Sequence, residues 1–236
     1  MPKRIMISLV YTHQDFYIVD KPAGIGFHDE KVEDNKLSKG FFNLCCDYFS
    51  ETLYPLHRLD KVTSGLLILG RNKSAANWFQ NAFEQKSVEK TYLALTNCKP
   101  KKKQGGIIGD MSKARGSQWK LLKTKENPAK TQFFSTALND ETYKRLRLCL
   151  LKPKTGKTHQ LRVALKSLSA PILGDELYGA EDSDRVYLHA YALKFDYKGE
   201  ALEFSQFPNN GLCYLNHKQQ IIEFVQNPFE HNWPES

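Results

Sequence analysis

The residue type and the setting of Asp60 make it the first candidate for chemistry. This aspartate follows His57 and Arg58, and a Thr63-Ser64-Gly65 turn then leads into the apolar run 66–69. A loop carboxylate at the mouth of a buried strand can serve as a nucleophile or as a base. It can also cap the backbone N–H groups of the turn that follows, which is a common use of aspartate. The residues alone leave both interpretations open.

A second candidate is the segment 156–162, in which a glycine turn leads into the cationic start of a predicted helix. Its last residue, Arg162, keeps its charge even when buried, because the pKa of arginine exceeds about 12. If Arg162 met Asp60 across a cleft, the guanidinium would hold the carboxylate ionised. Lys157 and Lys166 are more simply explained as phosphate contacts on a solvated basic face.

Tyr92 is the third candidate and lies in the predicted strand 88–95. A strand tyrosine commonly fills the core, but it can also stack on an unpaired base, a contact worth about 1–3 kcal/mol. Gly174-Asp175 and Tyr178-Gly179 are expected to form a shaped turn with a packing role. The histidines are expected to be structural groups or phosphate contacts, since no serine or cysteine nucleophile motif accompanies them; they are His57, His159 and His189.

The elements that must position these residues follow from hydrophobic periodicity. Because strands outnumber helices and short turns join many neighbours, we expect an α+β fold with a largely antiparallel mixed sheet and flanking helices. The periodicity predicts hairpins within 5–19 and 185–207, further strands at 66–69, 88–95 and 143–151, and helices at 36–49, 74–86 and 161–168.

Finer expectations concern the helix ends and one strand. Asn72 or Ser74 is the expected N-cap of the second helix, and Thr158 that of the third. The strand 143–151 alternates leucine with other residues and is expected to be half-buried. The third helix is expected to point three polar residues away from its apolar face, namely Gln160, Arg162 and Lys166.

The composition is that of an ordinary globular protein with a cationic surplus. Of 236 residues, 34 are Lys or Arg and 26 are Asp or Glu, which gives a formal net charge of +8. This surplus favours a polyanionic partner. The run 99–130 is rich in lysine, glycine and polar residues, so we expect a mobile surface excursion or a seam between subdomains there.

Several classes of protein and of site lack support in the sequence. The longest apolar runs are far short of the roughly 20 residues that cross a bilayer, and no signal-peptide pattern is present, so a cytoplasmic protein is expected. Without a glycine-rich phosphate-binding motif, no cofactor is expected. The five cysteines lack zinc-ligand spacing, so we expect no metal site and reduced, mostly buried thiols.

Taken in order, these segments resemble the RluA-type family of RNA pseudouridine synthases. Residues 57–67 match every fixed position of that family's signature H-R-L-D-x-x-T-S-G-L-L. The resemblance extends over about residues 21–208, although the opening motif 21–29 departs from the valine and proline that relatives more often carry. The other matching segments follow in the family's order and are 90–92, 156–162, 171–175 and 188–190.

This resemblance implies a pseudouridine synthase catalytic fold with a central RNA-binding cleft. It implies that Asp60 is the catalytic residue, that Arg162 is its ion-pair partner and that Arg58 occupies the space vacated by a flipped nucleotide. Tyr92 would lie against the target uracil and Leu161 would pack under it. We expect one catalytic domain over 1–236, without a separate S4-type RNA-binding domain, and a monomer. The remaining substrate contacts expected are His57 and Thr63.

The implied reaction isomerises specific uridines to pseudouridine in ribosomal or transfer RNA. The N1–C1′ bond breaks, the uracil turns, and C5 forms the new bond. Asp60 could attack C1′, take a proton from C2′ or add to C6. The target nucleotide must leave the helical stack, which costs least in loops.

Two alternatives use the same residues differently. A catalytically lapsed RNA-binding or RNA-folding factor of this fold would explain the basic charge without any product. A small-molecule glycosidase would need two carboxylates flanking one bond, and only one well-placed acid, Asp60, is evident.

Overall fold

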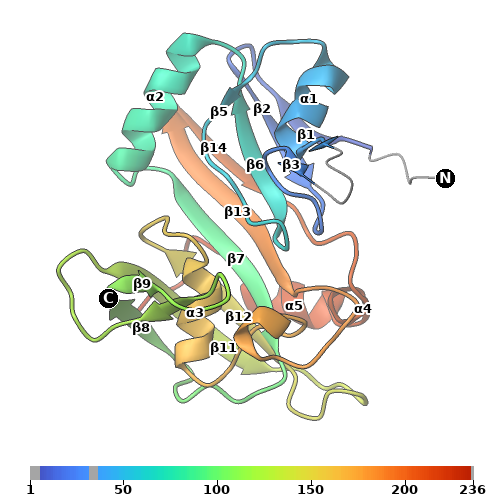
Figure 1. The fold of residues 1–236 in the computed structure, drawn as a ribbon, viewed down its shortest axis with the longest axis vertical. Coiled ribbons are helices and arrows are strands. Elements are labelled where there is room, and N and C mark those ends of the chain that lie inside the picture. The colour runs from blue at the N-terminus through green and yellow to red at the C-terminus, as the bar shows by residue number, and fades with distance from the viewer. Residues whose placement is uncertain (1–5, 32–36, 235–236) are drawn as a thin grey trace. The chain divides into compact units, whose positions relative to one another are not determined.

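The computed structural model describes residues 6–31 and 37–234, and the chain divides into two compact units, Met1–Val88 and Glu89–Ser236 (Figure 1). Every strand pairing described within either unit is antiparallel, as the α+β prediction requires. None of the helices in the described ranges is long and apolar enough to span a membrane.

The first unit is built on a small sheet in the order β1-β2-β6, with β5 on the other edge of β6. All seven residues of β6 are buried, which confirms the buried strand predicted at 66–69. Phe79 of the second helix packs edge-on against Phe16 of β2, with ring centroids 5.3 Å apart. The strands are β1 (Ser8–Thr12), β2 (Phe16–Lys21), β5 (Tyr54–Pro55) and β6 (Ser64–Gly70), with a separate ribbon of β3 (Glu30–Lys31) and β4 (Leu37–Ser38).

The two helices of this unit are α1 (Phe41–Phe49) and α2 (Lys73–Glu84). Asn72 is the N-cap of α2, and its side chain accepts a hydrogen bond from the Ala75 amide at 2.8 Å, as predicted. The prediction of a helix from residue 36 was wrong for 37–40, because 37–38 pair in β4; residue 36 lies outside the described residues. Gly40 then comes so close to the backbone of His28 that a Cβ would lie 2.2 Å from its carbonyl carbon.

The second unit contains a larger sheet in the order β13-β7-β12-β11-β8, with β14 on the outer edge of β13. The hairpin of β13 and β14 turns through Lys198 and Gly199, whose φ angles of 54° and 92° suit a tight turn. The strands are β7 (Glu89–Thr96), β8 (Gln104–Gly109), β9 (Met111–Lys113), β10 (Trp119–Leu121), β11 (Ala129–Ala137), β12 (Arg147–Pro153), β13 (Leu188–Tyr197) and β14 (Glu200–Ser205).

The strand predicted at 143–151 differs from the structure in two ways. It begins only at Arg147, because residues 143–146 form a turn that the Leu146 amide closes on the Tyr143 carbonyl. It is also buried on both faces rather than on one, since β12 is an inner strand and its residues from Leu148 to Lys152 are all covered. The run 99–130 contains β8, β9 and β10 and belongs to the second unit.

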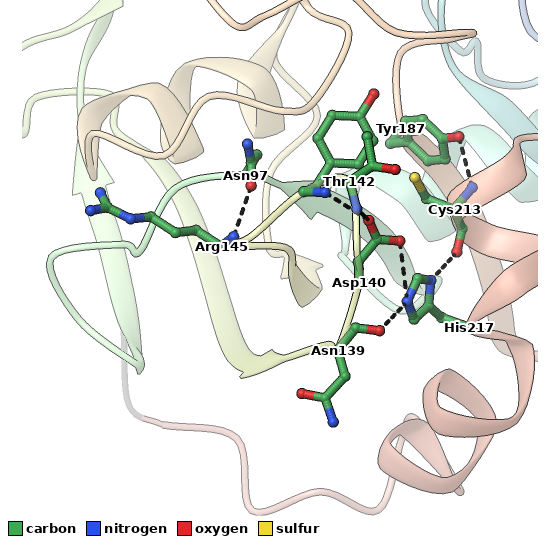
Figure 2. A network of polar contacts seen from close by, with 9 residues as sticks. Asn97, Asn139, Asp140, Thr142, Arg145, Tyr187, Cys213 and His217 are labelled. Carbon is green, nitrogen blue, oxygen red and sulfur yellow. Dashed lines mark hydrogen bonds and ion pairs between the residues drawn. The ribbon is translucent and has the colours of Figure 1, made fainter.

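The helices of the second unit are α3 (Gln160–Ser167), α4 (Leu212–Asn216) and α5 (Lys218–Val225), with one 3₁₀ turn at Glu176–Tyr178. Figure 2 shows how polar contacts fasten the loop before β12 to the start of α5. The ring nitrogens of His217 contact the carbonyl oxygens of Cys213 and Asn139, each at 2.8 Å. The Asp140 carboxylate in turn accepts the Thr142 amide at 2.8 Å, which holds the loop in one conformation.

Candidate active site

Asp60 lies in the loop between β5 and β6 and is half-buried, so its carboxylate is neither sealed in the core nor fully solvated. The Thr63 amide donates to the backbone carbonyl of Asp60 at 3.0 Å, and this main-chain bond closes the turn. The carboxylate is therefore not needed to cap the Thr63 amide. The catalytic role of Asp60 stays a prediction.

A buried lysine holds the backbone on both sides of this loop. Lys21, at the end of β2, is fully buried, and its ammonium donates to the carbonyl oxygens of Pro22 at 2.8 Å and Thr63 at 2.9 Å. The ammonium also lies 3.4 Å from the carbonyl oxygen of Lys61, which accepts the Gly24 amide at 2.8 Å. No role was predicted for Lys21 from the sequence. Its signal was a lysine at the end of an apolar strand and directly before Pro-Ala-Gly.

The other site residues of the first unit flank Asp60. His57 accepts a hydrogen bond from the Ile68 amide at Nε2, 2.9 Å away, and so ties the start of the loop to β6. This contact gives His57 a part in holding the loop, and its expected contact with the substrate stays a prediction. Arg58 is exposed, whereas Thr63 is 2% exposed and lies at the loop's end. The four predicted residues of this unit thus share one loop, and Arg58 is the one of them that is exposed.

In the second unit, the start of α3 is fixed by Gln160 rather than by the predicted cap. His159 occupies the N-cap position with φ 57° and makes no side-chain cap hydrogen bond, so the prediction for Thr158 was wrong. Gln160 is 5% exposed. Its amide oxygen accepts the Lys157 amide at 3.0 Å and the Thr155 hydroxyl at 2.7 Å, and its nitrogen donates to β11.

Arg162 points inward, contrary to the expectation that it lies off the apolar face of α3. It is 5% exposed and forms a bidentate ion pair with Asp175, in which Nε and Nη2 each lie 2.7 Å from a carboxylate oxygen. Burying an arginine requires such a partner, because an unpaired charge in the interior is costly. The Tyr178 ring lies under the guanidinium, 4.9 Å from Cζ.

The turn that carries Asp175 and Tyr178 therefore does more than pack, and this corrects the sequence interpretation. Gly174 has φ 80°, and a Cβ there would lie 2.0 Å from the carbonyl oxygen of Arg185, so only glycine fits. The backbone carbonyl of Asp175 also accepts the amides of Tyr178 at 3.0 Å and Ala180 at 3.2 Å. The turn is thereby rigid enough to fix the position of the Arg162 guanidinium.

The other candidates of the second unit lie on its inner elements. Tyr92 is 9% exposed on β7, where it faces Leu151 and Ala190 on the neighbouring strands, and Leu161 is 7% exposed on α3. The structure thus joins Leu161 and Arg162 on one helix and places Tyr92 on the sheet. The pairing of Arg162 with Asp60 stays a prediction.

The two remaining histidines of the sequence analysis make structural contacts. His159 Nδ1 lies 2.9 Å from the Tyr178 hydroxyl. His189 is 1% exposed, and its Nε2 donates to the Gln206 carbonyl at 2.8 Å. Burial lowers the pKa of His189 to about 3, although the hydrogen bond to Gln206 by itself raises that pKa. The ring is therefore neutral near pH 7.

The five cysteines carry no disulfide, and Cys45 and Cys149 are fully buried. All five cysteines are free thiols, and burial raises the pKa of Cys45 and Cys149 to about 12, which leaves both protonated. Within 6–31 and 37–234, no group of three histidine, cysteine or acidic side chains is placed to hold a metal ion.

Comparison with known proteins places the chain in a family. The sequence profile of the family described as RNA pseudouridylate synthase matches residues 15–167. An RNA pseudouridine synthase of Haemophilus influenzae is 47% identical over 228 residues, which cover 94% of this chain and 98% of that protein. The ribosomal large subunit pseudouridine synthase D of Borreliella burgdorferi is 33% identical, over 91% of this chain and 69% of that protein.

Solved structures agree with the sequence comparison. The structure described as human RNA pseudouridylate synthase domain containing 1 superposes with a TM-score of 0.76 and 26% identity, covering 98% of this chain and 97% of that one. The family profile spans both the Asp60 loop and the start of α3. The chain therefore belongs to the RNA pseudouridine synthases and is an isomerase that acts on RNA.

Proposed function

We propose that this chain isomerises a uridine of ribosomal RNA to pseudouridine and that Asp60 is its catalytic residue. The observation that supports this proposal is the position of Asp60, which is half-buried on a loop. The buried Lys21 ammonium donates hydrogen bonds to backbone carbonyl oxygens of that loop. A positioned carboxylate can act as a nucleophile or as a base on a ribose or a uracil, and the reaction needs no outside reagent.

Four further residues receive roles in this proposal. Arg162 pairs with Asp60 and keeps it ionised, while Asp175 holds the guanidinium from its other side. Arg58, exposed on the Asp60 loop, fills the gap left in the RNA stack when the target nucleotide flips out. Tyr92 lies against the uracil, and Leu161 packs under it.

Ribosomal RNA is the substrate class that the relatives favour. Two groups of relatives carry names of ribosomal large subunit pseudouridine synthases, D in Borreliella burgdorferi and C in Rickettsia bellii, the latter 34% identical over 77% of this chain. Transfer RNA is the other class that a uridine in an accessible loop could come from.

The test is tritium release from RNA that carries [5-³H]uridine, because C5 loses its hydrogen when it bonds to C1′. The purified chain is incubated with unmodified large-subunit ribosomal RNA and, separately, with unmodified bulk transfer RNA. Release from ribosomal RNA alone supports the proposal. Release from transfer RNA alone overturns the substrate, and binding to both without release would show a lapsed enzyme.

A further inference from the structure

The positive charge of the chain is concentrated in one segment. Residues 99–130 contain ten lysines and arginines and two carboxylates, a net charge of +8 that equals that of the entire chain. The remaining residues are therefore electrically balanced. Since the surplus is not spread over the surface, an anionic partner would be attracted to this segment in particular.

The most uniform part of the segment is residues 111–125, which we call the basic hairpin. Its strands β9 and β10 pair antiparallel, with Lys113 opposite Trp119 and Lys120 opposite Ser112. It contains five cations and no carboxylate. All five are exposed, and none of them forms an ion pair with another residue in the described part of the chain; they are Lys113, Arg115, Lys120, Lys123 and Lys125.

Hydrogen bonds to and from Asp110 hold the base of the basic hairpin. Asp110 accepts the backbone amides of Glu126 at 3.0 Å and Asn127 at 2.9 Å, and its own amide donates to the Thr124 carbonyl at 2.9 Å. A hydrogen bond from the Thr124 side chain, with those from the two amides, lowers the pKa of Asp110. The carboxylate next to the hairpin is thus used to hold the loop.

The same hairpin is joined to the setting of Arg162. The Trp119 amide donates to the Tyr178 hydroxyl at 3.0 Å, and the Tyr178 ring lies under the Arg162 guanidinium. β10 also packs against α3, which carries Arg162. A polymer lying along the basic hairpin would therefore be held at a fixed position relative to Arg162.

We propose that the basic hairpin is a docking surface for the phosphates of the RNA strand that flanks the target uridine. The inference rests on the proposed function, because it takes RNA as the polymer. Exposed, unpaired lysines and arginines suit phosphate groups, which they bind without reading sequence. The hairpin contributes affinity and places the RNA, while the chemical step belongs to the Asp60 loop.

The test compares two triple variants with the same change in charge. Lys113→Gln/Lys120→Gln/Lys123→Gln removes three cations of the basic hairpin, and Lys73→Gln/Lys144→Gln/Lys218→Gln removes three exposed lysines elsewhere. The affinity for a fluorescein-labelled RNA stem-loop is measured by anisotropy from 50 to 300 mM KCl. Circular dichroism melting checks that both variants fold, and Arg115→Gln/Lys125→Gln repeats the test at two other hairpin positions.

We expect the hairpin variant to bind about tenfold more weakly at 100 mM salt, with a salt slope smaller by about two, and the control to lose much less. In tritium release, the hairpin variant should show a raised KM and an unchanged kcat. Equal losses in the two variants would show that only net charge matters and would overturn the inference. Binding of the same variants to phosphatidylglycerol vesicles is measured as well. A loss of vesicle binding without any loss of RNA binding would also overturn the inference.

Because anisotropy needs no turnover, this outcome is independent of the proposed activity. An inactive wild-type chain that still binds through the hairpin refutes the proposed function alone. An active chain whose RNA affinity ignores the hairpin charges refutes the inference alone.

Discussion

The ion pair of Arg162 and Asp175 holds the guanidinium of Arg162 in place within the second unit. Both side chains are nearly fully buried, and two hydrogen bonds of 2.7 Å join them. Buried pairs of this kind add little stability as a whole, but removing one partner leaves the other charge uncompensated.

Asp175→Asn should therefore lower the free energy of unfolding by about 3 kcal/mol, since one hydrogen-bond acceptor remains but the negative charge is lost. Urea titration followed by circular dichroism measures the change. Glu176→Gln is the matched control, because Glu176 is the exposed neighbour of Asp175 and should change the unfolding free energy by less than about 0.5 kcal/mol. An Asp175→Asn variant as stable as the control would contradict the role assigned to this pair.

His189 gives a prediction about pH. Its pKa is lowered to about 3 in the folded chain, against about 6.5 in the unfolded chain, so it stabilises the fold above pH 6.5. That contribution is lost as the pH falls from 6.5 towards 3, by up to about 1.4 kcal/mol per pH unit, because only the unfolded state takes up the proton.

The change that isolates this effect is His189→Gln, which keeps a donor for the Gln206 carbonyl but does not titrate. Urea unfolding at pH 7.5, 6.0 and 5.0 should show a smaller loss of stability in the variant than in the wild-type chain. Parallel pH curves for the two proteins would mean that the ring is not held neutral in the fold.

The sequence could identify single site residues only where a short motif surrounds them. The H-R-L-D motif correctly indicated that Asp60 lies on a loop before a buried strand, because the motif is local, while the catalytic role of Asp60 stays a prediction. Asp175 was assigned to packing, because its partner lies 13 residues earlier on a helix whose orientation periodicity does not determine. Lys21 was missed because its partners are backbone carbonyls, which no side-chain pattern reveals.

At the scale of elements, His217 joins parts of the second unit that lie far apart in the chain (Figure 2). The ring is 5% exposed and contacts carbonyl oxygens on α4 and in the loop before β12. His217→Ala should lower the free energy of unfolding by about 1–3 kcal/mol, because the ring is buried and its contact with the buried Cys213 carbonyl is lost.

Thermal and urea unfolding measure this loss, with Gln219→Ala as the control at an exposed position of α5, the helix that His217 precedes. The control should stay within about 0.5 kcal/mol of the wild-type chain. If His217→Ala behaved like the control, the loop and the helix would be held by other contacts.

Hydrophobic periodicity located most elements, and local chemistry located some of their ends. Asn72 was predicted as a cap because capping depends on adjacent residues. The start of α3 was not, because Gln160 reaches back to Thr155 and Lys157 and across to β11, an arrangement that exists only once the sheet has formed. The full burial of β12 likewise depends on its neighbours in the sheet rather than on its own alternation.

For the molecule as a whole, the net charge follows from the composition, and the resemblance indicated the family. Neither predicted where on the molecule the charge lies. The segment 99–130 was expected to be mobile or to be a seam, but β8, β9 and β10 organise it. Glycine and lysine content indicates exposure, and it does not exclude short strands that pair with a neighbour.

The localised charge predicts that RNA binding by the wild-type chain is strongly salt-dependent. With about five phosphate contacts, the affinity should fall by roughly a hundredfold between 50 and 200 mM salt, because bound counterions are released on association. Anisotropy with a labelled stem-loop measures the slope. A slope near zero would mean that RNA is held without the phosphates.

If the Asp60 carboxylate performs the chemical step, Asp60→Asn should abolish tritium release from [5-³H]uridine RNA. Asp47→Asn is the control, since it makes the same chemical change at an exposed site on α1. We expect at least about a thousandfold loss of release for Asp60→Asn, with an unfolding temperature and an RNA affinity like those of the wild-type chain, and full release for Asp47→Asn. Release by a folded Asp60→Asn variant at the wild-type rate would contradict the catalytic role of Asp60.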